Sequence, residues 1–108
     1  MAVAKQMGIV IDGLCFHVAS QANSADTYRI ALLRCLEIAS DAASEGIATI
    51  ERIDIGGGFP ANYSNHAVDF DAFCQPIREA IEQVPAYIQL MAEPGRAISA
   101  PSMTLVSR

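Results

Sequence analysis

Two runs of residues in the 108-residue sequence have the chemistry of a phosphate site. The first is Gly56-Gly57-Gly58, because a backbone without side chains can approach a ligand closely and consecutive N–H groups can form an anion-binding concavity. The second is Gly95-Arg96, in which the glycine lets the backbone turn and the guanidinium group can bind a phosphate through two hydrogen bonds. The simpler interpretations are a tight turn for the glycines and a surface arginine for Arg96.

Three further residues with functional side chains, His17, Ser20 and Glu93, follow apolar segments. His17 could stack on a planar ring or transfer a proton, but a histidine in this position can equally be a hydrogen-bonded structural residue. Ser20 could donate to a phosphate or cap a helix. Glu93 comes directly after an apolar run, so we expect it to be partly buried and to need a partner. That partner is either the protonated ring nitrogen of a cofactor or Arg96.

Each of these runs follows a segment with the composition of a β-strand, and helical patterns separate the segments. We predict strands over residues 11–17, 49–55 and 87–92, with helices over residues 25–45 and 70–84 on one side of the sheet. Strands that alternate with helices are typical of parallel βα units, so the predicted fold class is α/β. Because parallel strands collect ligand-binding residues at their carboxyl ends, one concave region should contain His17, Ser20, Gly57, Glu93 and Arg96.

The helical patterns also predict where the helices begin and end. Ser24 or Asp26 should cap the first long helix, whose apolar stripe includes Tyr28, and the second should begin after Asp69. We expect Pro76 to interrupt that second helix with a kink or a restart. Residues 1–8 have the pattern of a short helix, and residues 97–108 fit either a helix or a strand.

Composition excludes several classes of protein. Apolar residues make up 52% of the chain, which excludes intrinsic disorder, and a net charge of −5 argues against broad nucleic-acid binding. No apolar run is long enough to span a membrane, and the first residues do not form a signal peptide, so we expect a soluble, cytoplasmic protein. Cys15, Cys35 and Cys74 are far apart and lack metal-ligand spacing, so we expect neither a disulfide framework nor a metal site.

Three sequence motifs together resemble the fold-type III pyridoxal-phosphate decarboxylases, the group that acts on ornithine, diaminopimelate and arginine. The motifs are Phe-His-Val-Ala-Ser-Gln at residues 16–21, Ile-Asp-Ile-Gly-Gly-Gly-Phe-Pro at 53–60 and Glu-Pro-Gly-Arg at 93–96. The resemblance implies an alanine-racemase-like (β/α)8 TIM barrel that is followed by a β domain. Residues 1–108 would then be a fragment of the cofactor-binding barrel domain, with about three parallel βα units and without the C-terminal β domain.

The resemblance also implies a role for each candidate residue. His17 and Glu93 would act in catalysis, His17 by stacking on the pyridine ring of pyridoxal 5′-phosphate and Glu93 by pairing with its protonated nitrogen. The remaining cofactor contacts would come from Ser20, Gly56, Gly57, Gly58, Gly95 and Arg96. The substrate would be a small amino acid, with ornithine favoured and a polyamine precursor such as putrescine as product. The whole enzyme would be a homodimer.

The sequence departs from this family at two places. Ala19 stands where the family usually has glycine, which adds a methyl group near the expected phosphate site. The one lysine, Lys5, precedes the first strand, whereas the family binds its cofactor as a Schiff base on a lysine at a strand end. The chain would therefore carry the phosphate and ring-nitrogen contacts without that lysine. The alternatives are a non-catalytic regulatory homologue of the decarboxylases and an unrelated phosphate- or nucleotide-binding α/β domain.

Overall fold

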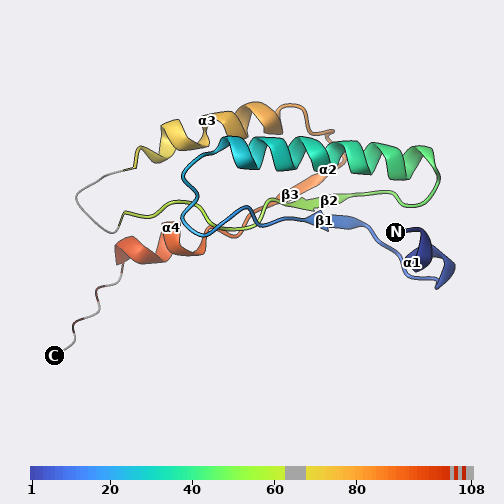
Figure 1. The fold of residues 1–108 in the computed structure, drawn as a ribbon, viewed down its shortest axis with the longest axis horizontal. Helices are drawn as coiled ribbons and strands as arrows, with labels where there is room; N and C mark the ends of the chain where they lie inside the picture. Colours follow the sequence, from blue (N-terminus) through green and yellow to red (C-terminus); the bar gives the residue numbers. More distant parts are fainter. Residues whose placement is uncertain (63–67, 103, 105, 107–108) are drawn as a thin grey trace.

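The computed structural model describes residues 1–62, 68–102, 104 and 106, and its elements alternate between helix and strand (Figure 1). In chain order they are α1 (Ala2–Gln6), β1 (Gly13–Cys15), α2 (Asp26–Ser44), β2 (Arg52–Asp54), α3 (Phe70–Ile81), β3 (Gln89–Met91), α4 (Gly95–Ser99) and a 3₁₀ turn, η1 (Ala100–Ser102). The predicted α/β class is confirmed. Residues 97–108 were predicted as either helix or strand, and the described part of this segment begins as helix, over α4 and η1.

The three strands form one parallel sheet in the order β1-β2-β3. In this register Ile53 on the central strand lies between Leu14 and Leu90. Each strand is shorter than predicted, because regular pairing covers three residues and less regular backbone bonds continue beyond it. For example, the N–H of Glu93 donates to the carbonyl of Gly56 at 2.9 Å. The predicted strand positions and parallel pairing are thus confirmed.

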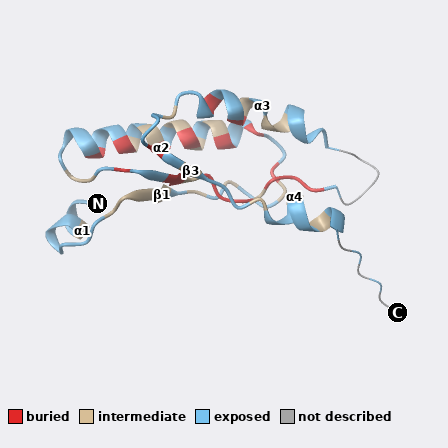
Figure 2. Ribbon diagram, turned by 180° about the vertical axis from the view of Figure 1, so that it is seen from behind, coloured by how far each residue is buried: buried red, intermediate tan, exposed pale blue. Residues whose placement is uncertain are grey.

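Helices α2 and α3 pack against each other and cover one face of the sheet, as predicted (Figure 1). Buried residues recur along α2, which faces the strand layer (Figure 2). Ile53 is 0% exposed at the centre of the sheet, and Leu32 of α2 is 1% exposed in the same core cluster. Helices α1 and α4 lie near opposite ends of the strands (Figure 1).

The starts of the two long helices follow the predicted capping residues closely. Helix α2 begins at Asp26, whose N–H donates to Ser24 Oγ at 3.2 Å, and the N-cap residue between them, Ala25, makes no side-chain cap. Helix α3 begins after Asp69, whose carboxylate accepts the N–H of Ala72 at 3.0 Å. Short polar side chains stabilise these ends because the first N–H groups of a helix lack backbone partners.

Of the two outcomes expected at Pro76, the restart is wrong, and the kink stays a prediction. One helix runs through the proline from Phe70 to Ile81 and ends before Pro85. A proline in a helix removes one backbone hydrogen bond, but it does not end the helix where packing compensates. Ile77, directly after the proline, and Ala80, one turn later, are both buried in the core, and their burial holds the second half of α3 in place.

The three cysteines are free thiols in different environments. Cys35 is buried, Cys74 is half-buried and Cys15 is exposed on β1. Burial raises the pKa of the Cys35 and Cys74 thiols, so both stay protonated and act as apolar side chains.

Across residues 1–62 and 68–102, no helix has the length and apolar character needed to cross a bilayer.

Candidate functional site

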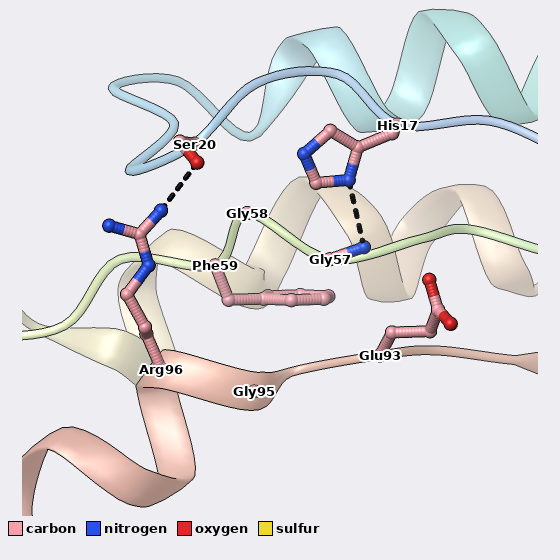
Figure 3. A pocket seen from close by; sticks show the side chains of 8 residues that line it. All are labelled: His17, Ser20, Gly57, Gly58, Phe59, Glu93, Gly95 and Arg96. Carbon is pink, nitrogen blue, oxygen red and sulfur yellow. Dashed lines mark hydrogen bonds between the residues drawn. The ribbon is translucent and has the colours of Figure 1, made fainter.

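A cavity of about 340 Å³ lies at the carboxyl ends of the three strands (Figure 3). It is lined by His17, Ser20, Gly57, Gly58, Phe59, Glu93, Gly95 and Arg96. Parallel pairing places the three strand ends at one edge of the sheet, so residues up to 79 positions apart in the sequence meet there. The structure thus brings together seven of the eight residues predicted for the site, and their chemical roles stay predictions.

Close contact between three loops forms the floor of this cavity. The loop after β2 passes so near its neighbours that a Cβ atom on Gly57 would come within 2.6 Å of the carbonyl oxygen of Glu93. A Cβ on Gly58 would come within 1.7 Å of the carbonyl oxygen of Ala19, and Gly58 also has a φ of +93°. Both positions therefore require glycine, because neither has room for a side chain and Gly58 has a backbone conformation that other residues rarely adopt.

Gly56 differs from the other two glycines because it does not line the cavity. Its N–H donates to Asp54 Oδ1 at 2.8 Å, so this aspartate anchors the local backbone. Its carbonyl accepts the N–H of Glu93. With both backbone groups engaged within the chain, Gly56 holds the loop in place, and the cofactor contact expected of it stays a prediction.

His17 is exposed above the glycine loop, and its Nδ1 accepts the N–H of Gly57 at 3.3 Å (Figure 3). A ring nitrogen that accepts a hydrogen bond carries no proton, so this contact favours the tautomer with its proton on Nε2. The hydrogen-bonded structural role and the ring-stacking role are compatible, because the bond uses one edge of the imidazole and leaves its faces available.

Arg96 and Ser20 form a polar pair on one side of the cavity. The Arg96 guanidinium donates to Ser20 Oγ and joins the loop after β1 to helix α4 (Figure 3). Both side chains are exposed. A guanidinium next to a hydroxyl can donate several hydrogen bonds to one anion, so the pair has the chemistry of a phosphate site.

The expectation that Glu93 is partly buried is wrong. Glu93 is exposed, and within the described part of the chain its carboxylate has neither a hydrogen bond nor an ion pair. Its backbone N–H is fixed to Gly56, which leaves the side chain at the open edge of the cavity. Of the two partners considered for Glu93, Arg96 forms no ion pair with it among the described residues, and its guanidinium donates to Ser20 Oγ. The ring nitrogen of a cofactor stays a prediction.

Two aromatic residues that were not predicted for the site, Tyr28 and Phe59, belong to it or support it. Phe59 lines the cavity, and its ring packs against that of Tyr28 with centroids 5.0 Å apart. The Tyr28 hydroxyl donates to the carbonyl of Gly57 at 2.9 Å. Burial raises the pKa of Tyr28 to about 12, so the hydroxyl remains a donor at neutral pH. A tyrosine in an apolar helix stripe was the available signal, because a buried phenol needs a hydrogen-bond partner.

Gln21, the last residue of the motif at 16–21, joins the loop after β1 to the loop after β2. Its side chain donates to the carbonyl of Ala61 at 3.0 Å and accepts the N–H of the same residue at 2.8 Å.

Ala19 does not line the cavity, and it is the carbonyl of Ala19 that lies against Gly58. The extra methyl group at Ala19 is therefore absent from the described cavity wall.

Lys5 lies at the opposite end of the sheet from these residues. Its Nζ donates to the carbonyl of Gly46, and it lines a separate cavity of about 410 Å³. Asp12 and Glu51, which directly precede β1 and β2, line the same second cavity. Lys5, which precedes the first strand in the sequence, therefore does not line the candidate site.

Comparison with known proteins identifies the class of protein that this architecture belongs to. Parallel strands with helices on one face and a cavity at their carboxyl ends match part of a TIM-barrel decarboxylase fold. A crystal structure of lysine/ornithine decarboxylase complexed with putrescine from Vibrio vulnificus superposes with a TM-score of 0.84 at 40% identity, over 89% of this chain and 26% of that chain.

The sequence comparisons identify the family. The family model "Pyridoxal-dependent decarboxylase, pyridoxal binding domain" matches residues 1–100, so the chain belongs to this family. The ornithine decarboxylase of Caenorhabditis elegans is 34% identical over 110 residues, which cover 99% of this chain and 25% of that protein. The lysine/ornithine decarboxylase of Selenomonas ruminantium is 32% identical over 108 residues, which cover 99% of this chain and 27% of that protein. The chain spans about a quarter of these relatives, and the alternative of an unrelated phosphate-binding domain is wrong.

The close packing of the glycine loop predicts a graded cost for side chains. Gly46→Ala should lower the free energy of unfolding by about 1 kcal/mol, because Gly46 has a positive φ but open space around it. Gly58→Ala should cost about 2–5 kcal/mol, because the clash with the Ala19 carbonyl adds to the same backbone strain. Chemical denaturation of both variants measures the difference, and equal costs would contradict the packing described for the loop.

Proposed function

We propose that this chain provides the phosphate-binding and ring-binding part of a pyridoxal-phosphate-dependent decarboxylase. The observation that carries the proposal is the distribution of charge in the cavity. Arg96 and Ser20 lie together at one end, and Glu93 lies at the other, beyond Phe59 (Figure 3). This arrangement suits a planar pyridine ring that has a phosphate at one side and a ring nitrogen at another. The glycine floor supports the fit, because a Cβ on Gly57 or Gly58 would meet backbone.

The phosphate end would use the chain's hydrogen-bond donors. Arg96 and Ser20 would bind the phosphate oxygens, together with the N–H of Gly58, which has no partner within the described residues. Hydrogen bonds from a guanidinium to an anion are stronger than neutral ones, so Arg96 should contribute most of the affinity. Gly95 leaves space beside Arg96, because a Cβ there would meet nothing within 4 Å.

The ring end would use His17 and Glu93. The face of His17 would lie against the pyridine ring, and the Glu93 carboxylate would hold a proton at the ring nitrogen. Pyridoxal phosphate, when bound, supplies a ring that accepts the electron pair left behind as carbon dioxide departs. Glu93 would keep that ring positively charged, and a carboxylate at the cavity edge that has no partner among the described residues is placed for this role.

The substrate that we propose is a basic amino acid of the ornithine and lysine type. Two solved relatives are lysine/ornithine decarboxylases in complex with putrescine and cadaverine, at 40% identity to this chain. An arginine decarboxylase bound to agmatine is similar at 32% identity. Ornithine remains our first choice, with putrescine as the product. We further propose that the chain is part of a barrel domain, and that the whole enzyme is a cytoplasmic homodimer.

Replacement of Arg96 should separate phosphate binding from ring binding. We expect Arg96→Met to weaken binding of pyridoxine 5′-phosphate by about 10- to 100-fold, because a charge-assisted contact is lost. Binding of pyridoxine, which lacks the phosphate, should be unchanged. Both ligands lack an aldehyde and so cannot react with Lys5. Calorimetry measures the affinities, with exposed Arg34→Met on α2 as the matched control. Equal affinity of Arg96→Met and the unmodified chain for the phosphate ester would contradict the proposal.

Replacement of Glu93 should change the protonation of the bound ring. A nearby carboxylate stabilises the protonated pyridine, so the ring nitrogen should lose its proton at higher pH in the unmodified chain than in Glu93→Gln. We expect the midpoint to fall by about 1–2 pH units in the variant. Ultraviolet absorbance of bound pyridoxine 5′-phosphate measures the titration, and Glu82→Gln, an exposed carboxylate after α3, is the control. Identical midpoints in Glu93→Gln and the unmodified chain would rule out this role.

The 108-residue chain by itself should not decarboxylate ornithine at an enzymatic rate. The family's reaction needs a lysine at the cofactor, and Lys5 is at the other end of the strands. Purified chain with pyridoxal phosphate and ornithine should release carbon dioxide no faster than free pyridoxal phosphate does. Turnover well above that background, which also persists in Lys5→Ala, would show that the site is complete without a lysine.

A further inference from the structure

Tyr28 contacts the cavity floor from behind without lining the cavity. It extends from α2, is 1% exposed, and donates its hydroxyl proton to the carbonyl of Gly57 at 2.9 Å. The ring is held by Phe59, 5.0 Å away, and by Phe73, whose ring meets it edge-on at 6.1 Å. The hydroxyl therefore has a fixed position in the core, and it engages the central residue of the glycine loop.

This hydrogen bond determines the direction of the next backbone N–H. The Gly57–Gly58 peptide is trans, like every described peptide bond, so its C=O and N–H point in opposite directions. Because Tyr28 holds the Gly57 carbonyl towards the core, the N–H of Gly58 points away from the core. Gly58 lines the cavity, and its N–H has no acceptor within the described part of the chain.

The glycines make such a contact necessary. Residues without a Cβ can occupy more than one backbone conformation, so the Gly57–Gly58 peptide could rotate by about half a turn if nothing held it. The rotated peptide would present a carbonyl oxygen to the cavity in place of an N–H. An oxygen there would repel a phosphate, whereas an N–H donates to it. The Tyr28 hydroxyl stabilises the orientation that favours an anion.

We propose that Tyr28 is a positioning residue that sets phosphate affinity by holding the Gly57 carbonyl, and through it the N–H of Gly58. The inference rests on the proposed function, because the anion is taken to be the cofactor phosphate. Tyr28 touches neither the cofactor nor the substrate in this arrangement. Its effect should therefore be specific to ligands that carry the phosphate.

The test is Tyr28→Phe, which removes the hydroxyl and keeps the ring. Binding of pyridoxine 5′-phosphate to the full chain should weaken by about 3- to 10-fold, the range for one lost neutral hydrogen bond. Binding of pyridoxine should not change. Tyr87→Phe is the matched control, since Tyr87 is 65% exposed and lies outside the cavity. Unchanged phosphate-ester affinity in Tyr28→Phe, or an equal loss for both ligands, would overturn the inference.

Two further measurements distinguish the positioning role of Tyr28 from a general loss of stability. They also distinguish it from a failure of the chain to bind the cofactor at all. Phe73→Leu loosens the packing around the Tyr28 ring but keeps the hydroxyl, so it should lower the melting temperature and retain the preference for the phosphate ester. The nitrogen NMR shift of the Gly58 amide, measured without ligand, should change in Tyr28→Phe and not in Tyr87→Phe. If the unmodified chain binds neither ligand, the proposed function fails. An unchanged Gly58 amide in Tyr28→Phe independently refutes the positioning role.

Discussion

The site depends on the close approach of the glycine loop to the loops on either side of it. Only hydrogen atoms fit at Gly57 and Gly58, where added Cβ atoms would reach the backbone oxygens of Glu93 and Ala19. This contact brings the loop after β1 and the loop after β3 within reach of each other. The hydrogen bond from Arg96 to Ser20 joins the same two loops. A side chain in the glycine loop would push these loops apart and so separate Arg96 from Ser20.

The hydrophobic core lies on the helical side of the sheet and supports the glycine loop from that side. Helices α2 and α3 cover one face of the sheet (Figure 1). The packed rings of Tyr28 and Phe59 continue this core up to the floor of the cavity. Charged side chains then lie at the open edge of the strands, where solvent reaches them. The site therefore combines a rigid backbone floor with side chains that can adjust to a ligand, which suits the binding of a charged cofactor.

Electrostatics in the cavity is local and differs from that of the whole chain. The net charge is −5, yet the guanidinium of Arg96 lies beside backbone and hydroxyl donors at one end of the cavity. Glu93 provides the opposite charge at the other end (Figure 3). An acidic protein can bind an anion in this way, because short-range hydrogen bonds decide the affinity at a built site while the net charge acts over longer distances.

Local composition and periodicity predict the α/β class, the positions of the strands, the two long helices and the strand-end motifs directly from the sequence. Tertiary structure alone decided that α3 continues through Pro76 and that Glu93 is exposed. It also decided that the N–H of Gly56 is bound by Asp54, and that Tyr28 supports the cavity floor from the core. These outcomes depend on hydrogen bonds and packing between residues far apart in the chain, and such partners become neighbours only once the sheet has formed.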